Sequence, residues 1–189
     1  MVARTCSIAA LFGLALAWAY SAPPFRLKTN GWWGNSAVGL CYEGLPWFTG
    51  AAVMSAAFPD QRVVMMAMLY SIGAHGIMTL NDFKSVEGDI KLGVASLPVQ
   101  LGVDYAARLA CAVMAAPQVV VILLLMSWGK PIHASIIAAL LAAQSVLMLR
   151  LIAAPRERAA WYNATGTSLY VLGLMAPAFD LRSLGGLAP

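Results

Sequence analysis

The chain has 189 residues, of which 61% are hydrophobic and only 11% are charged, and its mean hydropathy is +0.76. A soluble domain of this length could not bury so much apolar surface, so the composition indicates an all-α, polytopic membrane helix bundle. The formal net charge of +4 is too small and too dispersed to indicate a nucleic-acid partner.

Six apolar segments each come close to the ~20 residues needed to cross the hydrocarbon core of a bilayer. The expected spans are 5–21, 36–57, 61–81, 103–127, 132–153 and 164–181. Their connections alternate between long polar loops (22–35, 82–102 and 154–163) and tight turns (58–60 and 128–131). The pattern predicts one transmembrane domain over residues 1–189, with the three long loops on one side of the membrane.

The basic residues are divided unequally between the two sides of this arrangement. Eight lie on the side of the long loops: Arg26, Lys28, Lys84, Lys91, Arg108, Arg150, Arg156 and Arg158. Four lie on the other side: Arg4, Arg62, Lys130 and Arg182. Because positively charged loops tend to stay in the cytoplasm, we expect the long loops there and both termini on the opposite side.

The loop 82–102, called the acidic loop below, follows the third span directly. The stretch Asn81-Asp-Phe-Lys-Ser-Val-Glu-Gly-Asp89 holds three of the eight acidic residues, Asp82, Glu87 and Asp89. Carboxylates at a membrane face bind hard cations, and a hard cation there suggests a phosphate-bearing substrate. If the helix continued through Asp89, then Asp82 and Asp89 would share a face about 10 Å apart, which suits two ions or one ion and a water molecule. The alternative is a solvated loop that only ends a helix.

A second polar stretch, residues 22–30, is called the basic segment below. Pro23 and Pro24 are expected to break the helix where it leaves the membrane, which places Arg26 and Lys28 on the same side as the acidic loop. Two cations beside a carboxylate-bound metal would make a diphosphate site, since arginine grips phosphate oxygens in a fork. The alternative is that both residues only anchor the chain at the interface.

Glu43 is a carboxylate within the second expected span. Such a group normally faces a bundle interior or a cavity and has a partner there. Nearby Gly44 and Pro46 loosen the helix. Two roles for Glu43 are equally compatible with this position. In one, its side chain contacts a substrate; in the other, it is protonated and hydrogen-bonded to a neighbouring helix. His75, in the third span, is interpreted as a hydrogen-bonded core residue rather than a ligand.

These stretches resemble the UbiA superfamily of intramembrane prenyltransferases, and within it the chlorophyll and bacteriochlorophyll synthases. The residues that carry the resemblance are Tyr20 to Lys28, Asn30 to Asn35, Gly39 to Gly50, Asn81 to Gly102 and Trp161 to Gly166. The amino-acid sequence from Asn81 to Asp89 is specific to the chlorophyll and bacteriochlorophyll synthases within this superfamily. It disfavours a quinone- or haem-type prenyltransferase.

The resemblance implies a nine-helix bundle in a bacterial inner, intracytoplasmic photosynthetic membrane, in which acidic motifs on cytoplasmic loops hold Mg²⁺ for a prenyl diphosphate. The implied reaction esterifies the propionate of a (bacterio)chlorophyllide with a geranylgeranyl or phytyl group. The resemblance also assigns Asp82, Glu87 and Asp89 to the family's second acidic motif. The same side of the bundle offers substrate contacts: Arg26, Lys28, Asn81, Lys84 and, deeper in the membrane, Glu43.

The family's first acidic motif, of the form Asn-Asp-x-x-Asp-x-x-x-Asp, does not occur in these 189 residues. It is expected upstream of residue 1 together with three further helices, so we expect this chain to be inactive unless that part is supplied. The alternative is a catalytically inactive, shortened homologue that serves as a membrane subunit and holds pigment or lipid. Its partners would then be a photosynthetic complex or enzymes of pigment synthesis.

Overall fold

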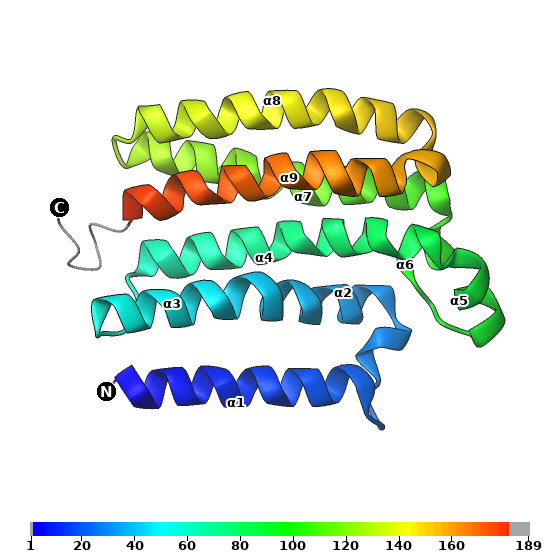
Figure 1. Cartoon of the computed structure of the whole chain (residues 1–189), viewed down its shortest axis with the longest axis horizontal. Coiled ribbons are helices and arrows are strands. Elements are labelled where there is room, and N and C mark those ends of the chain that lie inside the picture. The colour runs from blue at the N-terminus through cyan, green and yellow to red at the C-terminus, as the bar shows by residue number, and fades with distance from the viewer. Residues whose placement is uncertain (1, 182–189) are drawn as a thin grey trace.

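A computed structural model describes residues 2–181, and every long element in that range is helical. Short helices lie between the long ones, chiefly at the end of the bundle that carries the acidic loop (Figure 1). The elements are α1 (Val2–Ser21), η1 (Leu27–Thr29), α2 (Gly31–Gly39), η2 (Leu40–Gly44), α3 (Leu45–Ser55), α4 (Gln61–Asn81), η3 (Asp82–Lys84), α5 (Val86–Leu92), α6 (Leu97–Leu101), α7 (Val103–Ser127), α8 (Pro131–Ala153) and α9 (Pro155–Leu181).

The prediction of an all-α membrane bundle is confirmed, because the long helices run side by side along one axis (Figure 1). Within the described residues, four helices are long and apolar enough to cross a membrane: Val2–Ser21, Gln61–Lys84, Val103–Ser127 and Pro131–Ala153. The second expected span corresponds to α2, η2 and α3, which follow one another without a break. The sixth corresponds to α9. Arg182 lies outside the described residues.

Helix α4 occupies the centre of the bundle and packs against α2, α3, α7 and α9, while α8 packs on α7 and α9. The apolar core lies among α4, α7, α8 and α9, and Met66, Met114 and Ile137 are fully buried in it. Two tyrosines join α4 to α9 inside this core. The Tyr170 hydroxyl donates to the Tyr70 carbonyl at 2.8 Å, and the Tyr70 hydroxyl donates to the Gly173 carbonyl at 3.1 Å.

Helix α1 is different, since Ala9 is its buried residue and large apolar side chains such as Leu11 and Trp18 are exposed. It contacts α2, η1 and α3 at the edge of the bundle (Figure 1). An exposed apolar surface of this kind is compatible with lipid, where apolar side chains need no further cover.

The expected loop at 154–163 is wrong. Helix α8 ends at Ala153 and α9 begins at Pro155, so the Arg156–Arg158 sequence forms the first turn of a helix. Proline is well suited to the first helical position because its missing N–H would have no partner there. The polar residues in 154–163 were therefore not sufficient evidence for a loop.

The acidic loop does not continue the preceding helix, so the condition under which Asp82 and Asp89 would share a face is not met. The α4 helix ends at Asn81, a short 3-10 turn covers Asp82–Lys84, and α5 starts only at Val86. Gly93 then ends α5 with a left-handed backbone (φ 67°), which glycine adopts without strain. As a result, Asp82 and Asp89 do not lie two turns apart on one helix.

Candidate functional site in the membrane bundle

The basic segment and the acidic loop are joined by main-chain pairing. Asn30 and Ala95 form a parallel β-bridge, in which the Gly31 N–H donates to the Ala95 carbonyl and the Ala95 N–H donates to the Thr29 carbonyl, both at 2.8 Å. The Asn30 side chain also caps α2 by accepting from the Trp32 N–H at 3.0 Å. Arg26 and Lys28 therefore lie at the same end of the bundle as the acidic loop, as the sequence predicts.

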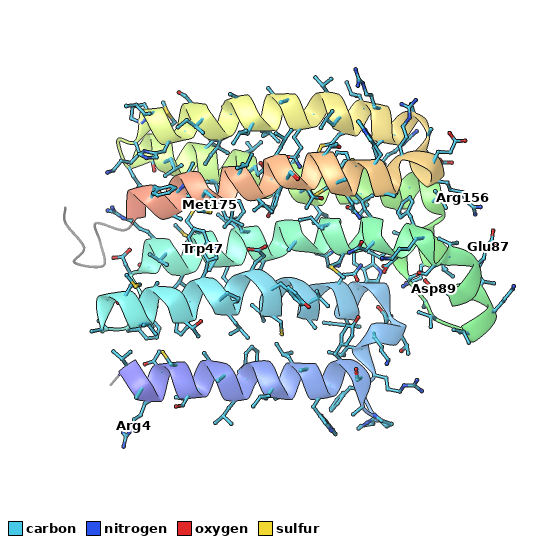
Figure 2. All side chains as sticks on the ribbon, in the orientation of Figure 1. Arg4, Trp47, Glu87, Asp89, Arg156 and Met175 are labelled. Atoms are coloured by element: carbon cyan, nitrogen blue, oxygen red, sulfur yellow. The ribbon has the colours of Figure 1, made fainter. Side chains whose placement is uncertain are left out.

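The predicted carboxylates occupy three different environments. Asp82 and Asp89 are partly buried, whereas Glu87 is exposed and points away from the end of the bundle (Figure 2). Ser85 links the first two, because its hydroxyl donates to the Asp89 carboxylate at 3.0 Å and can donate equally to the Asp82 carbonyl at 3.0 Å. The Ser85 hydroxyl thus connects the Asp89 carboxylate to the main chain of Asp82.

The Asn35 side chain donates a hydrogen bond to the Asp82 carboxylate. The Asn35 side chain is buried, and its Nδ2 donates to Asp82 Oδ2 at 3.2 Å and to Thr79 Oγ1 at 3.4 Å. Sequence reasoning assigned no role to Asn35. The signal was present, because a buried amide in an apolar span needs a polar partner.

A second amide pair connects the start of the acidic loop to α9. Asn163 Nδ2 donates to Asn81 Oδ1 at 3.1 Å, and the Thr167 hydroxyl donates to Asn163 Oδ1 at 3.4 Å. Asn81 and Thr167 both line the cavity described next. Asn163 was noted in the sequence only as part of a longer similar stretch.

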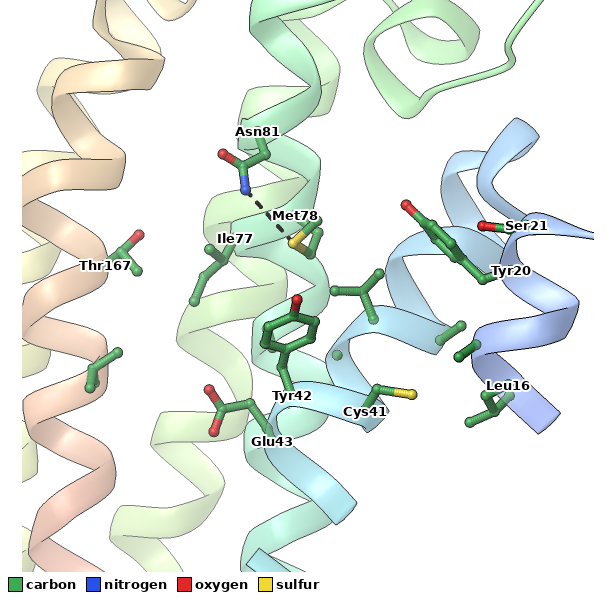
Figure 3. Close-up of a pocket in the computed structure, with 16 residues that line it drawn as sticks. Leu16, Tyr20, Ser21, Cys41, Tyr42, Glu43, Ile77, Met78, Asn81 and Thr167 are labelled. Atoms are coloured by element: carbon green, nitrogen blue, oxygen red, sulfur yellow. Dashed lines mark hydrogen bonds between the residues drawn. The ribbon is translucent and has the colours of Figure 1, made fainter. Parts of the chain in front are cut away.

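A cavity of about 690 Å³ lies between α1, the α2–α3 segment, α4 and α9 (Figure 3). Its volume is in the range of small-molecule and cofactor sites. Most of its lining is apolar, and its polar groups include Tyr20, Glu43, Asn81 and Thr167. Of the predicted site residues, Asn81 and Glu43 line this cavity, whereas Arg26, Lys28, Lys84, Asp82, Glu87 and Asp89 do not.

The donor set suits a hard divalent cation that is shared with a phosphate. Within residues 2–181, no three histidine, cysteine, aspartate or glutamate side chains come together as a closed metal site. Magnesium, however, is commonly bound by one or two carboxylates together with substrate phosphates and water. Asp82 and Asp89, on either side of Ser85, are the carboxylates of the acidic loop that could serve as such oxygen ligands.

Fold and site together define an integral membrane protein of the all-α class, with an apolar cavity that lies beside a charged loop. The chain belongs to the UbiA prenyltransferase family, whose model matches residues 1–172. Proteins of this family generally use divalent metal ions.

Two curated proteins are similar to this chain over most of its length. The chain is 60% identical to the bacteriochlorophyll synthase 33 kDa chain of Cereibacter sphaeroides, over 93% of this chain and 58% of that protein. It is 41% identical to the chloroplastic chlorophyll synthase of Arabidopsis thaliana, over 89% of this chain and 43% of that protein. The chain therefore spans less than two thirds of the length of these curated relatives.

A solved structure from a study of digeranylgeranylglyceryl phosphate synthase superposes with a TM-score of 0.74 at 21% identity. The superposition covers 90% of this chain and 59% of that chain, and it confirms the fold.

The hydrogen bond from Asn35 to Asp82 leads to a testable expectation. Replacing Asn35 by alanine should weaken the apparent affinity for the divalent ion by about tenfold, because partners of metal ligands typically contribute 10–100-fold. The measurement is a titration of the purified chain with a divalent metal ion. Ser36→Ala, which changes the exposed neighbouring residue on the same helix, is the control. An unchanged metal affinity in Asn35→Ala would show that Asn35 does not position Asp82.

Proposed function

We propose that this chain carries the acidic loop and the cavity of a (bacterio)chlorophyll synthase-like prenyltransferase. The reaction would transfer a geranylgeranyl or phytyl group from its diphosphate to the propionate of a (bacterio)chlorophyllide. The observation that carries this proposal is the pairing of Asn30 with Ala95, which joins the basic segment to the acidic loop at the end of the bundle where Asn81 lines the apolar cavity. The names of the similar bacterial and plant proteins support the same substrates.

Each charged group has a role in this proposal. Asp82 and Asp89 would hold Mg²⁺, which neutralises the charge on the diphosphate when bound. Arg26, Lys28 and Lys84 would contact the diphosphate oxygens, and Glu87, which is exposed, would add negative charge for the cation.

The propionate carboxylate would form a C–O bond to the first carbon of the prenyl group while the bond from that carbon to the diphosphate breaks. The diphosphate leaves with the electron pair, so no proton has to be removed. An apolar cavity would keep water from the reactive carbon.

We also propose that the acidic loop faces the cytoplasm in a bacterial inner, photosynthetic membrane. The excess of basic residues at this end of the bundle supports that orientation. With Cys6, Cys41 and Cys111 replaced by serine, a Lys91→Cys variant should react with a membrane-impermeant thiol reagent from the cytoplasmic face only, since Lys91 is exposed. Labelling from the opposite face would contradict the orientation.

We further expect that esterification requires the part of the related synthases that does not align with this chain. The test compares the purified 189-residue chain with the same chain co-expressed with the unmatched part of the Cereibacter sphaeroides protein. Each sample receives chlorophyllide, geranylgeranyl diphosphate and Mg²⁺, and ester formation is followed by chromatography. We expect ester only in the second sample, and its loss when EDTA removes the divalent ion.

Ester formed by the chain alone would overturn the requirement for a further region. No ester in either sample would overturn the enzymatic proposal. It would then favour a membrane subunit that holds pigment or lipid beside a photosynthetic complex.

A further inference from the structure

A π-helical turn, η2 (Leu40–Gly44), interrupts the long helical segment beside α4. Two glycines five residues apart, Gly39 and Gly44, allow this segment to pack closely against Ser71 of α4. A Cβ atom at Gly39 would lie 2.5 Å from the Ser71 carbonyl oxygen, and one at Gly44 would lie 2.7 Å from the Ser71 hydroxyl. On a regular α-helix these positions would be about 140° apart, so the wider turn is what lets both face α4. Such turns occur frequently at functional sites.

The π turn directs Glu43 into the cavity. Glu43 and Tyr42 both line the cavity, and the Glu43 carboxylate points to the side of the cavity where Thr167 of α9 lies (Figure 3). Within residues 2–181, this carboxylate has no hydrogen-bond or ion-pair partner. A carboxylate at membrane depth is costly unless it is paired. Its partner is therefore expected to be a group that enters the cavity.

The two proposed substrates differ in what they can offer to a carboxylate. A prenyl diphosphate is apolar except for its anionic end, which a carboxylate would repel and which suits the basic segment instead. A (bacterio)chlorophyllide carries hydrogen-bond acceptors on its rim, and its central magnesium ion can take a further oxygen ligand. Magnesium prefers oxygen ligands, and carboxylates are among the strongest of them.

We infer, on the basis of the proposed function, that Glu43 is the cavity's contact for the (bacterio)chlorophyllide macrocycle, through the macrocycle's central magnesium. The cavity extends from Glu43 to Asn81, the residue that directly precedes Asp82. A macrocycle held by Glu43 would therefore have room to direct its propionate toward the acidic loop. The prenyl diphosphate would approach from the end that carries Arg26 and Lys28.

The test measures binding rather than turnover, so it can use the purified chain in detergent. Chlorophyllide is titrated and followed by its absorbance change, and geranylgeranyl diphosphate is titrated separately in the presence of Mg²⁺. Glu43→Leu should raise the chlorophyllide Kd about 10- to 100-fold, because contacts to a charged group are worth about that much. The Kd for geranylgeranyl diphosphate should change less than about twofold, which also shows that the variant folds.

Two comparisons separate this contact from others. Pheophorbide, the magnesium-free analogue, should bind wild type and Glu43→Leu equally. Glu157→Leu, which replaces an exposed carboxylate outside the cavity, should bind chlorophyllide like wild type. Equal losses for chlorophyllide and pheophorbide would overturn the magnesium contact, and so would an unchanged chlorophyllide Kd in Glu43→Leu.

The outcomes also distinguish this inference from the proposed function. Glu43-dependent binding of chlorophyllide without ester formation by the complemented protein would overturn the enzymatic proposal alone. Absence of saturable chlorophyllide binding by the wild-type chain would overturn the inference.

Discussion

Replacing Asp82 by asparagine should lower kcat/KM for esterification by about 100-fold or more. The Asp82 carboxylate accepts a hydrogen bond from Asn35, and the Ser85 hydroxyl lies within hydrogen-bond distance of the Asp82 main-chain carbonyl and the Asp89 carboxylate. Because loss of an outer partner already costs 10–100-fold in metal affinity, loss of the ligand itself should cost more. The residual activity of Asp82→Asn should not be restored by raising Mg²⁺, since an amide is a weaker ligand for a hard cation than a carboxylate. The measurement is initial-rate kinetics in the complemented protein.

Asp104→Asn is the matched control for Asp82. Asp104 is exposed at the start of α7, at the same end of the bundle, and it lines a different, smaller cavity with Arg156 and Glu157. Its replacement changes the net charge equally and should leave esterification within about twofold of wild type. If Asp82→Asn retained wild-type kcat/KM and the same Mg²⁺ dependence, Asp82 would have no place in the site.

Replacing Gly31 by alanine should reduce both stability and activity. A Cβ atom there would lie 2.5 Å from the Leu97 backbone nitrogen and 2.9 Å from Leu97 Cγ. Leu97 is fully buried, so the chain must shift, and overpacking of this kind costs about 1–3 kcal/mol. The shift would separate the basic segment from the acidic loop, because Gly31 donates the main-chain bond to Ala95. Misplacement by about 1 Å can cost on the order of 100-fold in rate.

The measurements for Gly31→Ala are the thermal unfolding midpoint in detergent and kcat/KM at saturating Mg²⁺. Gly88→Ala is the control, since a Cβ atom at Gly88 meets nothing within 4 Å and alanine favours the helix α5. Gly88→Ala should therefore keep the wild-type midpoint or raise it. A wild-type midpoint and rate in Gly31→Ala would show that the two segments need not be held together by this contact.

The spans could be predicted from the sequence because hydropathy over ~20 residues is a direct physical requirement of the bilayer. The tight turns at 58–60 and 128–130 lie between helices as expected, and Pro131, assigned to the second turn from the sequence, is the first residue of α8. The error at 154–163 arose because charge was taken as evidence for a loop, although Pro155 is a good first helical residue and the charged residues that follow are tolerated at a helix end.

The candidate site was predicted in part. The residue types at Asp82 and Asp89 indicated a hard cation, and the prolines before Arg26 placed that residue at the same end. The sequence placed the end of the third span at residue 81, where α4 ends, but it left open whether Asp82 and Asp89 share one helical face; the turn at Asp82–Lys84 shows that they do not. The roles of Asn35 and Asn163 depend on partners 47 and 82 residues away in the chain.

Composition and hydropathy by themselves determined that this protein is a helical membrane bundle, since continuous apolar segments of ~20 residues cross a bilayer as helices. They also located the charged segments, because charged residues are excluded from lipid. Only the tertiary structure decided which of these residues meet. The Asn30–Ala95 pairing, the amide bonds from Asn35 to Asp82 and from Asn163 to Asn81, and the turn that directs Glu43 into the cavity all join segments across helices. Local sequence cannot encode such contacts, because they depend on how neighbouring helices pack at the positions of their glycines.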